Sequence, residues 1–269
     1  MNGASAWRRA SGAVLVGVGS CLALYLAAPL VGLVAATSWG DFSLGLQHPL
    51  VWPALRLSVV TTSISLLIVV LFGTPLAWTL ARSSGRLWRM VEVVVQLPAV
   101  IPPAVAGVAL LLSFGRRGLF AGWLYPQGWS VTFTTAAVIM AEVFVSAPFF
   151  VQSATSAFRR LDPNSIIVAR TLGAFPLRVF SRIELPQAMP GLLAGAAMSW
   201  ARSLGEFGAT LMFAGNLLGK TQTLPLAIYT AFESDLRAAQ ALSLMLIVVA
   251  FGVLVIVRSA GARHRSPER

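Results

Sequence analysis

Charged residues are scarce in this chain of 269 residues. Asp, Glu, Lys and Arg make up 11% of it, and 57% of the residues are hydrophobic, whereas a soluble domain carries about 25% charged residues. So few charges cannot cover a surface that faces water on every side, which excludes an ordinary soluble protein. The composition predicts an all-α membrane protein.

Cysteine and histidine are almost absent as well. Cys21 is the single cysteine, which excludes an intramolecular disulfide, and His48 and His264 lie far apart outside the apolar runs. A zinc site needs several such ligands close together, so we expect no metal and no cofactor. No His-based or paired-Asp motif lies in an apolar run, which disfavours a membrane enzyme, and we expect no catalytic residue.

Long apolar runs are what the chain has instead, and about 20 such residues cross a bilayer as a helix. The first run is too long for the core of a signal peptide, about 7–15 residues, and predicts an uncleaved helix. In total the sequence predicts six transmembrane helices, at about 13–36, 55–81, 92–114, 133–157, 187–214 and 239–258.

The basic residues between these runs set the orientation. Fourteen of the twenty Lys and Arg lie on one side, together with both termini, five lie on the other side, and Arg202 lies within the fifth run. The positive-inside rule places the first side, and therefore both termini, in the cytoplasm. Because the basic residues are spread between apolar runs, the net charge of +11 reflects membrane topology and not nucleic-acid binding.

The last cytoplasmic loop, residues 158–186, has clear helix signals. Asp162 before Pro163 predicts the N-cap and first residue of a helix over about 163–172, and Gly173 predicts the left-handed residue that ends it.

A second short helix, about 176–184, is expected to begin at Pro176 and to stop at Pro186. Neither helix is long enough to fold alone. Their apolar residues therefore lie on the bilayer surface or against a cytoplasmic protein, and the physics alone leaves both open.

The same loop resembles the signature of permease subunits of binding-protein-dependent ABC importers. That signature reads Glu-Ala-Ala, three residues, Gly, nine residues, Ile-x-Leu-Pro, and Ile167 and Val168 stand here in place of its Glu and first Ala. From the second alanine onward the spacing is complete, at Ala169, Gly173, Ile183, Leu185 and Pro186.

Further stretches resemble the molybdate and tungstate branch of these permeases, with the sulfate permeases as close relatives. They include QLPAVIPPAVAGVALLLSFGRRG, ARSLGEFGATLMFAGN and TQTLPLAIYTAFESD. The resemblance implies a type I importer permease domain over 54–258, preceded by a tail, helix and outer loop in 1–53 and followed by a cytoplasmic tail in 259–269.

In that family the loop is a coupling helix that sits in a cleft of the ATP-hydrolysing subunit. The residues that the resemblance assigns to coupling are Ile167, Ala169, Arg170, Gly173, Ile183, Leu185 and Pro186. It also implies two cytoplasmic ATP-binding subunits, an extracytoplasmic oxyanion-binding protein and a second copy of the chain. The chain has no G-x-x-x-x-G-K-[ST] loop, so we expect the ATPase activity in a separate subunit and no enzyme activity here.

Ionisable residues inside a span are candidates for function, and the chain has Glu142, Arg202 and Glu206. Arg202 and Glu206 are four residues apart and share a helix face. They form either a self-neutralising structural pair or a guanidinium that Glu206 orients along an anion path. Glu142 is expected to have a structural or gating role.

Polar groups near Arg202 complete the predicted substrate path. Hydroxyl and amide donors suit an oxyanion, so Ser203, Thr210 and Asn216 join Arg202, although Ser and Thr in a span also bond to their own helix. Pro102 and Pro103 interrupt the third span and either shape a gate or bend the helix.

The resulting hypothesis is an inner-membrane permease that imports molybdate or tungstate by alternating access. A sulfate or thiosulfate permease is the alternative within the class. An ATP-independent channel or carrier is the alternative outside it.

Overall fold

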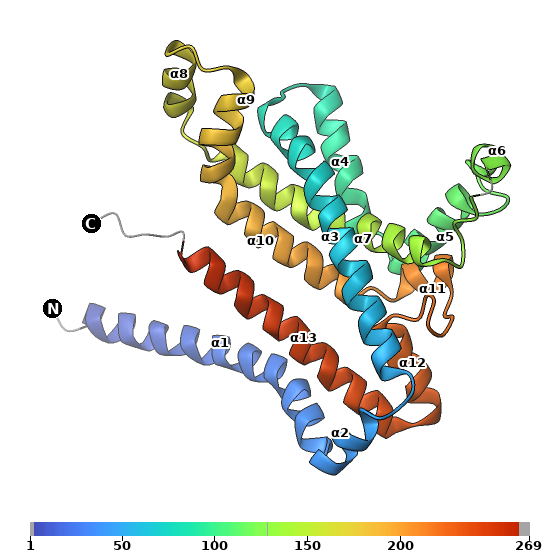
Figure 1. Cartoon of the computed structure of the whole chain (residues 1–269). Coiled ribbons are helices and arrows are strands. Elements are labelled where there is room, and N and C mark those ends of the chain that lie inside the picture. The colour runs from blue at the N-terminus through green and yellow to red at the C-terminus, as the bar shows by residue number, and fades with distance from the viewer. Residues whose placement is uncertain (1–2, 128, 264–269) are drawn as a thin grey trace.

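The computed structural model describes residues 3–127 and 129–263, and every regular element in these ranges is helical (Figure 1). Among the described residues, four helices are long and apolar enough to cross a membrane: α1 (Gly3–Ala36), α3 (Val51–Arg82), α7 (Thr135–Arg159) and α13 (Leu236–Arg263). The pair α4 (Arg86–Val100) and α5 (Pro103–Phe114) is a fifth if it counts as one span. The all-α membrane architecture is confirmed, and the number of six stays a prediction.

The remaining elements are shorter or more polar. They are α2 (Trp39–Gly45), α6 (Ala121–Leu124), the 3₁₀ turn η1 (Tyr125–Gln127), α8 (Pro163–Thr171), α9 (Pro176–Val179), the π-helical turn η2 (Phe180–Glu184), α10 (Leu185–Leu204), α11 (Gly208–Ala214) and α12 (Leu224–Ser234).

Helices α3, α7 and α10 pack side by side and form one core of the molecule (Figure 1). Phe150 of α7 is fully buried at its centre. A Cβ on Gly73 of α3 would lie 2.8 Å from the Phe150 ring, so a glycine is needed there. Burying such a ring contributes about 1.5–3 kcal/mol.

Gly191 and Gly195 bring α10 against α7. A Cβ on Gly191 would collide with Ala157, and one on Gly195 would lie 2.8 Å from the Ser153 Cβ. The Ser153 hydroxyl also donates to the Gly191 carbonyl oxygen at 2.9 Å. These two glycines form a GxxxG pair and allow the close helix packing that is typical of it.

Gly191→Ala is expected to destabilise the bundle by about 1–3 kcal/mol, because the added methyl group overfills a packed interface. Thermal unfolding of the purified protein in detergent measures the loss. Gly32→Ala is the matched control, since Gly32 lies in the apolar helix α1 with nothing within 4 Å of its added Cβ. Equal melting temperatures for the two variants would contradict the packing interpretation.

The expected third span, 92–114, is not one straight helix. Helices α4 and α5 meet at a bend of 117°. Neither Pro102 nor Pro103 has an N–H for the helix ladder, and Pro103 instead occupies the first turn of α5, where the missing N–H is harmless. The predicted bend is confirmed, and a gating role stays a prediction.

The expected fifth span, 187–214, is wrong as one continuous helix. Helix α10 ends at Leu204, Phe207 leaves helical geometry with φ −127° and ψ −56°, and α11 starts at Gly208. The Glu206 carboxylate accepts a hydrogen bond from the Ala209 N–H at 2.7 Å, so this side chain satisfies one of the free N–H groups at the start of α11.

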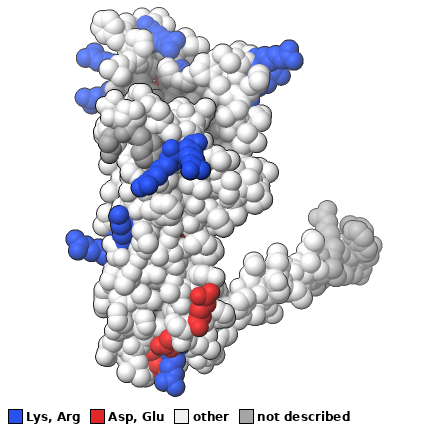
Figure 2. All heavy atoms as spheres, turned by 90° about the vertical axis from the view of Figure 1, so that its right-hand side faces the viewer, with Lys and Arg blue, Asp and Glu red and all other residues white. Residues whose placement is uncertain are grey.

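Basic and acidic side chains are distributed unevenly along the long direction of the molecule. Most Lys and Arg side chains that are visible in Figure 2 lie in the half that holds α8 and α9, and the visible carboxylates lie near the opposite end. This distribution agrees with a cytoplasmic face formed by the α8–α9 end.

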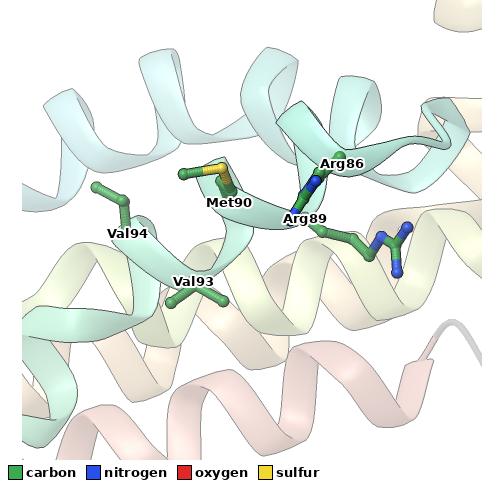
Figure 3. Close-up of a pocket in the computed structure, with 5 residues that line it drawn as sticks. All are labelled: Arg86, Arg89, Met90, Val93 and Val94. Atoms are coloured by element: carbon green, nitrogen blue, oxygen red, sulfur yellow. The ribbon is translucent and has the colours of Figure 1, made fainter.

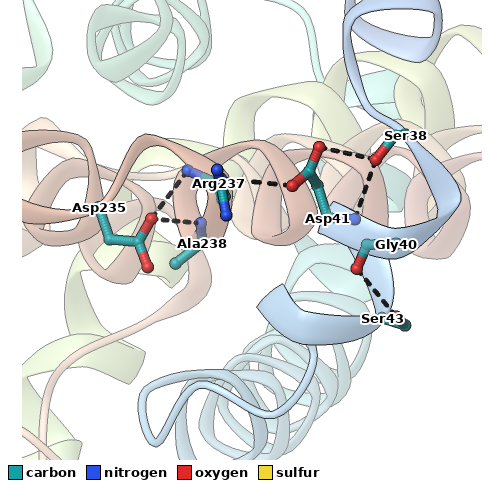
Figure 4. Close-up of polar contacts among 7 residues, drawn as sticks. All are labelled: Ser38, Gly40, Asp41, Ser43, Asp235, Arg237 and Ala238. Atoms are coloured by element: carbon teal, nitrogen blue, oxygen red, sulfur yellow. Dashed lines mark hydrogen bonds and ion pairs between the residues drawn. The ribbon is translucent and has the colours of Figure 1, made fainter.

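At the opposite end, polar contacts fasten α2 to α13 (Figure 4). Arg237 at the start of α13 pairs with Asp41 of α2 at 3.3 Å. The Asp235 carboxylate accepts from the Arg237 N–H at 3.0 Å and so caps α13. Glu233 is exposed, whereas Asp235 is partly covered because of this capping role.

Candidate functional site

Helix α8 has the ends that its sequence predicts. The Asp162 carboxylate accepts a hydrogen bond from the Asn164 N–H at 3.0 Å, and Pro163 occupies the first turn. Gly173 has φ +81°. The Ala174 N–H donates to Ala169 and the Gly173 N–H to Arg170, which is the hydrogen-bond pattern of a Schellman motif.

The segment that contains α8, the turn at Gly173 and α9 exposes a large apolar surface. Leu172, Phe175 and Leu177 are 82%, 76% and 77% exposed, and Ile167 is 59% exposed. Arg170 is exposed among them. Apolar groups this open at the end of a protein mark a surface that contacts a partner or a membrane.

The predicted second helix begins at Pro176 and residues 176–184 are helical, as expected, but the predicted stop at Pro186 is wrong. Helix α9 covers one turn and continues through η2 directly into α10. In η2 the Leu185 N–H bonds to the Phe180 carbonyl, five residues back. This wider turn comes just before Pro186, which sits in the first turn of α10 and so needs no N–H donor there.

The Ile-x-Leu part of the signature is partly or fully buried, whereas Pro186 is exposed. Ile183 and Leu185 are half-buried, and Leu185 packs against the core that α3, α7 and α10 share. Between them Glu184 is buried and contacts α3. The sequence analysis did not single out Glu184. The signal that could have identified it is a carboxylate directly before Leu185-Pro186, where α10 begins.

Arg202 and Glu206 form an ion pair across the end of α10. The Arg202 Nη2 and Glu206 Oε2 atoms are 2.7 Å apart, which confirms that the two residues share a face. The Glu206 side chain is 1% exposed and the Arg202 side chain 26%. Since Glu206 Oε1 also caps α11, the carboxylate is fixed at both oxygens. A guanidinium has five N–H donors, so Arg202 keeps donors for an anion.

The residues around Arg202 form an open stripe on α10. Met198, Ala201 and Gly205 are exposed on the same side, at helical spacing. A charged group that faces lipid is expensive. The stripe therefore faces a polar path or another polypeptide chain.

The two broken helices meet beside this pair. Helix α5 packs along α11, and a Cβ on Gly208 would lie 2.9 Å from the Pro103 Cβ. The bend at Pro102 and Pro103 thus touches the break that follows Arg202. Broken membrane helices of this kind expose polar backbone groups only inside a protein or beside a water-filled cavity.

The predicted hydroxyl donors lie deeper than Arg202. Ser203 is 2% exposed and Thr210 is fully buried, and their hydroxyls have no hydrogen-bond partner among the described residues. Asn216 is tied elsewhere, because its Nδ2 donates to Thr230 of α12 at 2.9 Å. The structure therefore brings Arg202 and Glu206 together, and places Asn216 in a contact with α12.

Glu142 fastens α7 to α3. It is 1% exposed and accepts hydrogen bonds from Thr61 at 2.8 Å and Ser65 at 2.7 Å. Both donors belong to α3. These contacts support a structural role for this buried carboxylate.

A pocket of about 560 Å³ lies on α4, away from these groups (Figure 3). Its lining side chains all come from one exposed helix face: Arg86, Arg89, Met90, Val93 and Val94. It contains none of the predicted path residues, so it does not define the candidate site.

Fold and site together define a polytopic helical membrane protein with an exposed docking segment and an ion pair at the junction of two broken helices. The family model described as "Binding-protein-dependent transport system inner membrane component" matches residues 70–265. The chain belongs to this family, and it is a multi-pass protein of the inner membrane.

Individual relatives cover nearly the whole chain. The molybdenum transport system permease protein ModB of Mycobacterium tuberculosis is 46% identical over 240 residues, which is 89% of this chain and 90% of the relative. The molybdate/tungstate transport system permease protein WtpB of Pyrococcus abyssi is 36% identical over 245 residues, 90% of this chain and 92% of the relative.

The fold has solved counterparts. A chain from a bacterial ABC transporter that imports the acidic polysaccharide alginate superimposes with a TM-score of 0.72 at 18% identity. The match covers 93% of this chain and 94% of that one. At this identity the likeness shows the fold, and it agrees with the family that the sequence comparison gives.

Proposed function

We propose that this chain is the permease subunit of an ABC importer that carries molybdate or tungstate into the cytoplasm. The observation that carries the proposal is the Arg202 guanidinium, partly exposed on α10 and held by a buried carboxylate at the junction of two broken helices. The names of the two relatives, a molybdenum and a molybdate/tungstate transport system permease, support the choice of oxyanion.

The energy is proposed to come from two separate ATP-binding subunits. The nearest approach to a phosphate-binding loop, at Gly219-Lys220-Thr221, has Ala214 where the first glycine is needed. It follows helix α11 and not a strand. Docking is assigned to the exposed apolar segment, and coupling to Ile167, Ala169, Arg170, Gly173, Ile183, Leu185 and Pro186.

The path is proposed to run between two copies of the chain. The open stripe beside Arg202 suits such an interface, since it presents one charge that lipid would not accept. Ser203, Thr210 and Asn216 remain proposed path residues, and Glu206, Glu142, Pro102 and Pro103 proposed structural or gating residues. An extracytoplasmic binding protein would deliver the oxyanion, and the domain is proposed to span 54–258 with both termini in the cytoplasm.

Uptake into proteoliposomes tests this function. The chain is reconstituted with its ATPase subunits and binding protein, and molybdate accumulation is measured with and without ATP. We expect ATP-dependent uptake that tungstate inhibits strongly and sulfate weakly. Strong inhibition by sulfate would favour a sulfate permease. Uptake that needs no ATP would favour a carrier, and no uptake of any oxyanion would refute the proposal.

A further inference from the structure

The proposed docking segment, from α8 through η2, is joined to α3 by a buried carboxylate. Glu184, the last residue of η2, is 1% exposed. One carboxylate oxygen lies 2.7 Å from Arg82 Nη2, and the other accepts a hydrogen bond from Trp78 Nε1 at 2.5 Å. Both partners lie in the last turns of α3.

Aromatic contacts surround this carboxylate. The Phe180 ring meets the Trp78 ring edge-on at 5.9 Å, and the Arg82 guanidinium lies 4.9 Å from the centre of the Trp78 ring. Trp78 and Arg82 are four residues apart on α3, as Phe180 and Glu184 are on the segment. We call these four residues the cytoplasmic clasp.

Helix α3 is bonded to other elements along its whole length. At mid-height Thr61 and Ser65 donate to Glu142 of α7. Near its outer end the Ser58 hydroxyl accepts from the Leu224 N–H, at the start of α12, at 2.7 Å. The α3 residues that make these three contacts, Ser58, Thr61 and Ser65, are all buried. Directional hydrogen bonds thus join α3 to α7 and, near its outer end, to α12.

We propose that Glu184 is a positioning residue through which the docking segment moves α3, and through α3 the outer helix α12. The inference rests on the proposed function, because it assumes that an ATPase subunit displaces α8. Apolar contacts between η2 and α3 are non-directional, so they do not fix the two elements to each other. A buried carboxylate with two donors does fix them, since leaving either partner unpaired is unfavourable.

Glu184→Gln tests the clasp in the complete importer. Glutamine still accepts from Trp78 but cannot pair with the Arg82 charge. We expect normal copurification with the ATPase subunits and near-normal ATP hydrolysis, with about a tenfold lower uptake per ATP hydrolysed, which is within the usual range of coupling between sites. An unchanged uptake per ATP would overturn the inference.

Glu92→Gln is the matched control. It removes the ion pair of Glu92 with Arg159, 3.0 Å apart, at the same end of the molecule but between α4 and α7. We expect its uptake per ATP to stay close to that of the wild type. An equal fall in both variants would show a general effect of losing an ion pair at this end of the molecule and would also overturn the inference.

A distance measurement follows the motion itself. A spin label is placed at Phe232, which is exposed on α12, in a Cys21→Ser background, and the label-to-label distance between two copies is measured with and without ATP. We expect ATP to change this distance in the wild type and not in Glu184→Gln. The same change in both would overturn the inference, whereas no change in the wild type would count against the proposed function itself.

Trp78→Phe decides the matter if Glu184→Gln does not assemble. It keeps an aromatic ring against Phe180 and removes the donor to Glu184. We expect lower uptake per ATP in this variant too, and wild-type coupling in it would overturn the inference.

Discussion

Arg202→Ala is expected to lower ATP-driven molybdate uptake by at least about a hundredfold, because it removes the proposed anion contact and leaves the buried Glu206 carboxylate unpaired, a change that costs about 3–5 kcal/mol. Uptake and thermal stability are both measured, since the unpaired charge also weakens the fold. Arg202→Lys is expected to recover part of the uptake, because it keeps the positive charge. The recovery is incomplete because an ammonium cannot form the two parallel hydrogen bonds of a guanidinium.

The double variant Arg202→Met with Glu206→Gln separates the two roles that the sequence leaves open. Glutamine still accepts from the Ala209 N–H, and the buried charge is gone, so the fold should be as stable as the wild type. If Arg202 serves the anion, uptake stays low in this stable protein. If the pair is only structural, uptake returns, and Arg202 must be removed from the proposed path.

Gly173→Val is expected to lower uptake per ATP by about tenfold without preventing membrane insertion, a loss typical of a disturbed coupling contact. Gly173 has φ +81° with nothing within 4 Å of an added Cβ. The effect is therefore backbone strain, about 1–2 kcal/mol for a left-handed residue with a side chain, and not a clash. The turn opens, and α8 no longer lies at its angle to α9.

Gly173→Asn is the control for this turn, because asparagine tolerates the left-handed conformation. We expect it to keep most of the coupling. Uptake and ATP hydrolysis are measured in the same proteoliposomes, and copurified ATPase subunit reports on docking. Wild-type coupling in Gly173→Val would contradict the role of this turn.

Local sequence signals were sufficient where a structure depends on neighbouring residues. The N-cap at Asp162 and the turn at Gly173 follow from the residue types themselves, and α8 begins and ends within one residue of its prediction. The i, i+4 pairing of Arg202 with Glu206 also follows from helix geometry. The rule that Pro186 ends a helix failed because a π turn just before it changed the hydrogen-bond pattern.

The sequence by itself determined the membrane class, the asymmetry of basic residues and the spacing that places the chain in its family, because these depend on composition and on distances along the chain. Only the tertiary structure decided that the fifth span breaks as well and that this break, at Gly208, meets the bend at Pro103. It alone decided that Glu184 is buried on α3. Such contacts join residues about a hundred positions apart, and their partners are chosen by packing, which no local pattern contains.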